Sequence, residues 1–211
     1  MARRGVQFAF SVLLVATASA SAQDLIDRVV ARVDGVAITL TDVRAALGLG
    51  VVNAPAGADA VGAGMRQLID RQLMLAEVQR FPPPEPPAAA LDREVARLTG
   101  AAGDGLTALM QSTGATRQRI QDLARGNLRI LAYLDERFGP AEQVTDDDAA
   151  QYYRDHETEF TRDGRLAPFE EVAELARQRA STGRRNASIE QWLGDLRARA
   201  DIVVNPAVAA P

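Results

Sequence analysis

Three consecutive carboxylates and a single histidine are the side chains of this sequence that could do chemistry. Asp146, Asp147 and Asp148 form the acidic run, which directly follows Thr145. A metal site needs oxygen ligands that converge on one point, whereas consecutive residues of a helix diverge by about 100°. A threonine followed by acidic residues is typical of a helix N-terminus, where negative charge is favoured. We therefore interpret the run as a helix start and predict no metal site.

His156 is the candidate general base, and it lies at the predicted C-terminal end of the same helix. An imidazole in this position, flanked by acidic residues, usually has a solvated role. Glu170 and Glu171 follow Pro168 in the first turn of another predicted helix, so the same dipole argument covers them. The sequence has neither a Gly-x-Ser-x-Gly nucleophile elbow nor a glycine-rich phosphate loop. These patterns predict no catalytic residue.

The composition excludes several kinds of chemistry. The 211-residue chain has no cysteine, no lysine and one histidine. Disulfides, thiolate nucleophiles, Schiff-base lysines and multi-histidine metal sites are therefore excluded. The formal net charge of −4 at pH 7 argues against a nucleic-acid partner. With 47% hydrophobic and 25% charged residues, the chain is typical of a globular protein, and we expect no cofactor.

The first 22 residues are typical of a secretory signal peptide. Arg3 and Arg4 give a positive start, a mostly apolar run extends from Val6 to Ala18, and small residues precede a cleavage site after Ala22. This is the three-part layout of an export signal. The apolar run is shorter than the about 20 residues that span a bilayer. We predict an exported, periplasmic protein with no stable membrane insertion after cleavage.

Hydrophobic periodicity predicts a mainly helical fold with a small antiparallel sheet. Alternating apolar residues on both sides of Asp34-Gly35 predict a hairpin over 29–38. The apolar segment from Ile202 to Val204 predicts a third strand, because two strands alone are marginally stable. Helical spacing predicts helices over 41–47, 65–80, 91–98, 106–111 and 116–138, further helices that begin near 145 and 168, and a last apolar stripe over 189–196. Gly183 predicts a break between the last two, and Asn205 to Pro211 a frayed tail.

Methionines and aromatic residues are the candidates for binding unfolded polypeptide. Flexible, polarizable methionine suits a surface that accepts many sequences, although core packing is the alternative role for each of these residues. The candidate binding residues are Met65, Met74, Met110, Tyr152, Tyr153 and Phe160.

Four segments, in this order, resemble the SurA family of periplasmic chaperones and its membrane-anchored relative PpiD. The hairpin VVARVDGVAITLTDV resembles the family's opening segment, and the helix with QLIDRQL resembles its next helix. The acidic helix start VTDDD with its following Tyr-Tyr and Phe is similar to a third family helix. The stretch from Pro168 to Ile202 resembles the closing helix and strand. The similarity covers nearly all of the mature chain and is weakest over 82–114.

One departure from the family pattern changes the expected activity. The family usually carries one or two parvulin-type prolyl isomerase domains between the third helix and the closing segment. Here only residues 161–167 separate Phe160 from Pro168, which is far less than a domain. The resemblance therefore implies the helical chaperone module without the isomerase, and we expect the protein not to be an enzyme.

These observations predict a domain organisation and a function. We expect a signal peptide over 1–22, a SurA N-terminal-like helical region over 23–165, a helix and strand over 166–205 that complete the same domain, and a disordered tail over 206–211. The resemblance implies an ATP-independent chaperone that holds unfolded outer-membrane or secreted proteins. The alternatives are an adaptor that docks one folded envelope partner and a degenerate prolyl isomerase.

Overall fold

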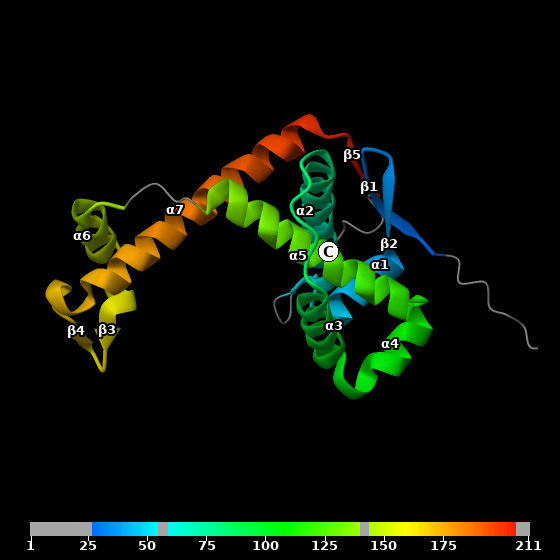
Figure 1. Ribbon diagram of the computed structural model, residues 1–211, viewed down its shortest axis with the longest axis horizontal. Helices are drawn as coiled ribbons and strands as arrows, with labels where there is room; N and C mark the ends of the chain where they lie inside the picture. Colours follow the sequence, from blue (N-terminus) through cyan, green and yellow to red (C-terminus); the bar gives the residue numbers. More distant parts are fainter. Residues whose placement is uncertain (1–26, 55–58, 140–143, 206–211) are drawn as a thin grey trace, which may run out of the picture.

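The computed structural model describes residues 27–54, 59–139 and 144–205. The chain is mainly helical, and a small antiparallel sheet joins its two ends (Figure 1). This confirms the predicted fold class. The predicted signal peptide over 1–22 and the predicted tail over 206–211 lie outside the described residues.

The three-stranded sheet has the first strand of the chain at its centre. Strand β1 (Val29–Val33) pairs with β2 (Val36–Thr39) on one side and with β5 (Ile202–Val204) on the other. Both pairings are antiparallel. The turn between β1 and β2 is Asp34-Gly35, whose φ angles of 48° and 81° are the positive values that such a turn requires. The predicted hairpin and its third strand are therefore confirmed.

Hydrogen bonds of the backbone and of the Asp34 side chain join the end of the chain to the hairpin. The Asp34 amide donates to the Asp201 carbonyl, and the Asp201 amide donates to the Asp34 carboxylate, each at 2.9 Å. The Asn205 amide donates to the Val30 carbonyl at 2.9 Å. These bonds fix the position of the chain end that follows the last helix relative to the hairpin.

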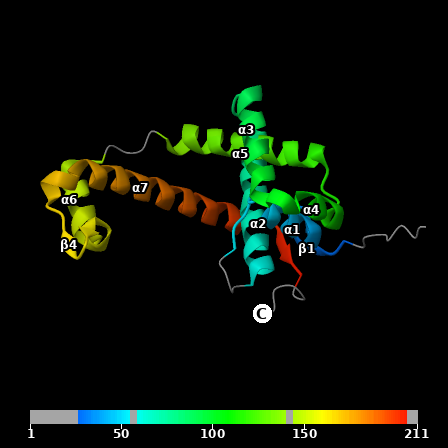
Figure 2. The same ribbon diagram turned by 90° about the horizontal axis from the view of Figure 1, so that it is seen from below.

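Most of the helices form a body around a central helix. That central helix is α2 (Ala60–Arg80), which the longest helix of the middle of the chain, α5 (Arg117–Phe138), crosses (Figure 2). The other helices of the body are α1 (Leu40–Gly48), α3 (Ala88–Ala102), the 3-10 turn η1 (Gly103–Gly105) and α4 (Leu106–Thr113). One apolar core joins the sheet, α1, α2, α5 and the end of α7 (Phe169–Arg199), and a second lies between α3, α4 and α5.

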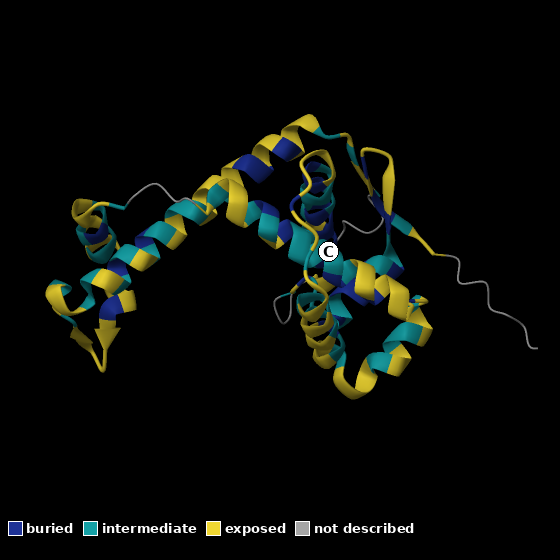
Figure 3. Cartoon of the chain, viewed as in Figure 1, coloured by how far each residue is buried: buried dark blue, intermediate teal, exposed yellow. Residues whose placement is uncertain are grey.

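The last helix links this body to a separate small unit. Helix α7 has 31 residues, so it is about 46 Å long at 1.5 Å per residue. Its N-terminal half packs against α6 (Asp146–Asp155), the 3-10 turn η2 (Glu157–Phe160) and the short hairpin of β3 (Thr161–Arg162) and β4 (Arg165–Leu166). We call this assembly the outer unit. It has its own apolar core around Phe160, while its hairpin is exposed (Figure 3).

The structure corrects the predicted helix boundaries in three places. The first helix begins at Leu40, one residue before the predicted start, because Thr39 and Asp42 form a reciprocal capping box. The predicted helix over 91–98 extends over all of α3. The predicted break at Gly183 is wrong, since α7 continues through it while Tyr152 packs 3.7 Å from where a Gly183 Cβ would lie.

Trp192 holds the C-terminal half of α7 on the body. Its ring lies 5.7 Å from that of Tyr133 and 5.5 Å from that of Phe138, both on α5. Ring pairs at this separation add to the burial of a large apolar surface. The contact therefore holds α7 on the body in addition to the short pairing between β5 and β1.

We predict that Trp192→Ala lowers the free energy of unfolding by about 3–5 kcal/mol, because it leaves a large cavity between α5 and α7. Urea denaturation followed by circular dichroism measures this change. The control is Gln191→Ala, at an exposed neighbouring position, which should change stability by less than about 0.5 kcal/mol. Equal effects of the two substitutions would contradict the proposed anchoring role.

Candidate functional site

A groove of about 430 Å³ opens on the surface where α2, α3, α5 and α7 meet. We call it the central groove. Its apolar walls come from four segments that are far apart in the sequence. Their side chains are Val51, Val52, Met74, Ile130, Leu131 and Leu193. The volume lies within the usual range for a ligand site, at the small end.

The elements of the fold place each wall of the central groove. Met74 projects from α2, Leu131 from α5 and Leu193 from the part of α7 that Trp192 anchors. Leu131 is 56% exposed, although it lies in the middle of a well-packed helix. An exposed leucine beside a half-buried methionine gives this groove an apolar surface that a partner could cover.

Arg71 brings a buried positive charge to the same groove. Its side chain lines the groove from α2, and the residue is only 9% exposed. Its Nη2 atom donates to the Leu123 carbonyl oxygen of α5 at 3.1 Å. Burial lowers the pKa of Arg71 to about 10, while the nearby Glu94 carboxylate opposes this shift. The guanidinium group is therefore still charged at neutral pH, in a mostly apolar setting.

Gly126 makes room for this guanidinium group against α5. A Cβ at position 126 would lie 2.7 Å from Arg71 Nη2, closer than two such atoms can approach without a shift. Glycine in the interior of a helix costs about 0.5–1 kcal/mol relative to alanine. The close approach of Arg71 is a structural reason for a glycine at this position.

The other charged side chains of the groove are paired. Glu94 accepts two hydrogen bonds from Arg97, at 2.7 and 2.8 Å, and one from the Asn127 amide at 2.7 Å. The hydrogen bond from Arg97 is the main reason why the pKa of Glu94 is lowered. Asp70 accepts two hydrogen bonds from Arg197 of α7, at 2.6 and 2.7 Å. Asp70 is thus neutralised by Arg197. Glu94 is neutralised mainly by Arg97, with a smaller contribution from Arg71.

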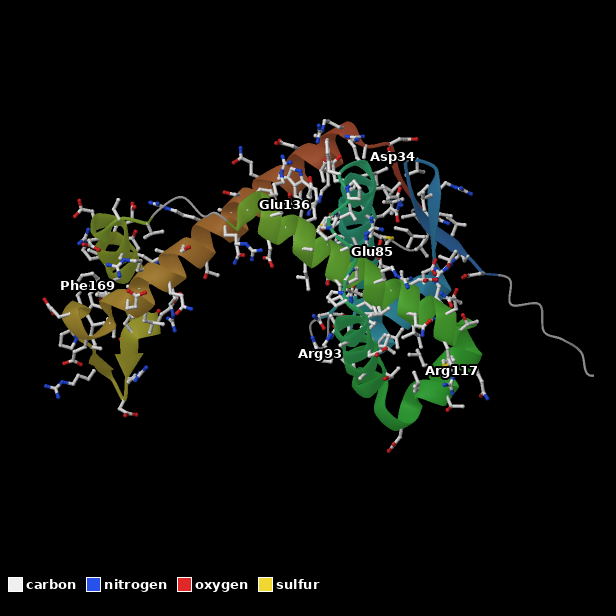
Figure 4. All side chains as sticks on the ribbon, in the orientation of Figure 1. Asp34, Glu85, Arg93, Arg117, Glu136 and Phe169 are labelled. Carbon is white, nitrogen blue, oxygen red and sulfur yellow. The ribbon has the colours of Figure 1, made fainter. Side chains whose placement is uncertain are left out.

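The connector between α2 and α3 also lies against α5. Glu85, within its proline-rich stretch, is 3.9 Å from the guanidinium nitrogens of both Arg125 and Arg129 (Figure 4). Proline-rich segments are stiff and extended. The connector therefore spans the outside of α5 on the way to α3.

A second groove, of about 580 Å³, lies between α3, α4 and α5. We call it the α4 groove. Val95, Leu106, Met110 and Ile120 give it apolar walls, and Arg117 lies at its edge. It is larger than the central groove but has no buried charge among its described lining residues.

The structure places the six predicted binding residues in four separate environments. Met65 is buried in the main core at 3% exposure, Met74 lines the central groove, and Met110 lines the α4 groove. The three aromatic residues lie in the outer unit, where Phe160 is buried and Tyr153 donates to the Ala167 carbonyl at 2.6 Å. Figure 4 shows Phe169 of that unit at the opposite end of the molecule from Arg117. The six residues therefore do not form one site.

Sequence reasoning missed the residues that distinguish the central groove. Arg71 interrupts the apolar face of the helix predicted over 65–80, and Gly126 interrupts the helix predicted over 116–138. A charged residue on an apolar stripe and a glycine inside a strong helix are the two signals that could have marked the site.

His156 and the acidic run have structural roles in the described chain. Thr145 and Asp148 form a capping box, which together with Arg184 lowers the pKa of Asp148 to about 2. His156 stacks on Tyr152 with ring centres 4.0 Å apart. Among the described residues, no three His, Asp or Glu side chains are grouped so that they could hold a metal ion. No helix of the described chain is long and apolar enough to cross a membrane.

Comparison of the chain with protein-family models, with curated proteins and with solved structures found no match.

We predict that Arg71→Met raises the free energy of unfolding by about 1–2 kcal/mol at neutral pH, because it replaces a desolvated charge by an apolar side chain of similar length. The pKa of Arg71 is lowered on folding to about 10, so the destabilisation is complete below that pH and disappears at higher pH. Urea denaturation at pH 7 measures the difference.

The control for this prediction is Arg66→Met, on the exposed side of the same helix, which should change stability by less than about 0.5 kcal/mol. A loss of stability in Arg71→Met would contradict the view that this cation is a cost to the fold.

Proposed function

We propose that the protein is an exported, ATP-independent chaperone that holds segments of unfolded outer-membrane or secreted proteins in the central groove. The observation that carries the proposal is the open apolar groove with its exposed Leu131 and adaptable Met74. The signal-like start of the chain and its resemblance to the SurA family supply the compartment and the class of client.

Holding is a matter of mass action. A chaperone that binds unfolded chains lowers the concentration of free unfolded protein and so slows its aggregation. A groove of about 430 Å³ accommodates a few apolar side chains, which makes each contact weak. Methionine at the binding surface adapts to side chains of different shape. We therefore propose weak binding that tolerates many client sequences.

The proposal excludes prolyl isomerase activity. Between Phe160 and α7, the chain forms only the β3–β4 hairpin with an Asp163-Gly164 turn. A parvulin-type domain inserted at this point would need a segment of domain size. The proposal therefore keeps the chaperone module of the family and leaves out its enzyme.

We predict that the protein suppresses light scattering by a porin diluted from denaturant, and that Leu131→Ser weakens this suppression. Loss of the exposed leucine removes about 1 kcal/mol of apolar contact, which corresponds to roughly fivefold weaker binding. The matched control is Leu166→Ser, because Leu166 is 38% exposed and lies in the outer unit.

Suppression by the wild type and by Leu166→Ser, with loss in Leu131→Ser, supports holding in the central groove. No suppression at several-fold molar excess of wild type would reject the holding function. Recovery of one folded, stoichiometric partner from the periplasm, without suppression, would favour the adaptor instead.

We predict that a protease-coupled assay with a proline-containing peptide shows only uncatalysed isomerisation, which takes tens to hundreds of seconds at 25 °C. A purified parvulin serves as the positive control. A rate that increases in proportion to the concentration of this protein would contradict the prediction.

A further inference from the structure

Arg71 has hydrogen-bonding capacity that the fold does not use. A guanidinium group has five N–H donors in a fixed planar arrangement. Among the described residues, Arg71 forms the one hydrogen bond to the Leu123 carbonyl and no ion pair. More than nine-tenths of the residue is buried, and its side chain lines the central groove. A buried charge that Glu94 compensates only in part is costly, and a ligand carboxylate would lower that cost.

Of the described charged residues that line the central groove, Arg71 is the one that forms no ion pair, and Glu94 compensates its charge only in part because that carboxylate is hydrogen-bonded to Arg97. The other charged lining residues are Asp70, Glu94 and Arg97. Glu94 is paired with Arg97, and Asp70 is paired with Arg197. When these two pairs are set aside, one positive charge is left in the groove. An anionic group that enters it therefore meets Arg71 without displacing an existing ion pair.

We propose that Arg71 binds the C-terminal carboxylate of an extended peptide whose last side chain is apolar and fills the central groove. The inference rests on the proposed function of that groove, which it makes more specific. Guanidinium and carboxylate groups fit each other in a planar, two-bond geometry that is stronger than a neutral hydrogen bond. Burial strengthens this interaction further, because water screens it less.

The apolar surroundings of Arg71 favour a chain terminus over an acidic side chain. A C-terminal residue carries its carboxylate and its own side chain on the same α-carbon. The groove has the same combination, since Arg71 shares it with Met74, Ile130 and Leu131. An internal aspartate or glutamate uses its own side chain to supply the carboxylate, so a neighbouring residue would have to supply the apolar group for these walls.

The test compares two fluorescent peptides of the same apolar sequence ending in leucine, one with a free C-terminal carboxylate and one amidated. A third, amidated peptide carries an aspartate in place of the last but one residue. Fluorescence anisotropy gives the affinity of each peptide for the full chain. We expect wild type to bind the free acid roughly tenfold more tightly than either amide, the effect of one charge-assisted contact.

Two variants connect this preference with Arg71. Arg71→Met should remove the preference for the free acid while binding of the amidated peptide stays within about twofold, because the apolar walls are intact. Gly126→Ala should reduce the preference, since a Cβ there displaces the guanidinium group. Arg66→Met, on the exposed side of the same helix, should keep it.

Each other result rejects the inference. Equal binding of acid and amide by the wild type, a preference that persists in Arg71→Met, or equal binding of the aspartate peptide and the free acid would each overturn it. The wild-type comparison does not depend on any variant folding. If light scattering of porin is suppressed while acid and amide bind equally, the holding function stands and only the role of Arg71 falls.

Discussion

The pairing of the first strand with the last is the constraint on which the rest of the structure depends. Strand β1 is the centre of the sheet, and β5 reaches it only if α7 ends beside the hairpin. This fixes the C-terminal half of α7 against α2 and α5, where Trp192 packs on the α5 aromatic rings. Leu193 is then held as one wall of the central groove. A short strand at the end of the chain thus determines the shape of a site formed mainly by other elements.

The central groove and the outer unit differ in how their apolar side chains are used by the fold. The three aromatic residues of α6 and η2 pack against α7 and close a small core, so their surface is largely used by the fold. The central groove has the opposite character. It leaves Leu131 exposed and holds Arg71 in a buried position, where we predict that its charge lowers stability. Residues that destabilise a fold in this way are concentrated at functional sites, because selection for stability alone would replace them.

Local sequence patterns predicted most of the helices and strands. The features that they did not predict depend on packing between residues far apart in the sequence. The Asp34-Gly35 turn and the apolar strand at 202–204 gave the sheet, because turn chemistry and alternation act over a few residues. The same Asp-Gly pattern at 163–164 forms the β3–β4 turn. Gly183 stays helical because α6 packs on the face of α7 that contains it. This packing outweighs the low helix propensity of glycine. The groove could not be predicted, since its walls come from four distant segments and Arg71 meets α5 only in the folded chain.

A photoreactive side chain at the central groove tests the account most directly. With p-benzoylphenylalanine in place of Leu131, and in a second protein in place of Leu166 of the outer unit, each variant is irradiated together with an unfolded porin. The account predicts crosslinks from position 131, their loss when an excess of unlabelled apolar peptide is added, and none from position 166. Crosslinks from position 166 with none from position 131 would show that clients bind the outer unit, and would contradict the central claim.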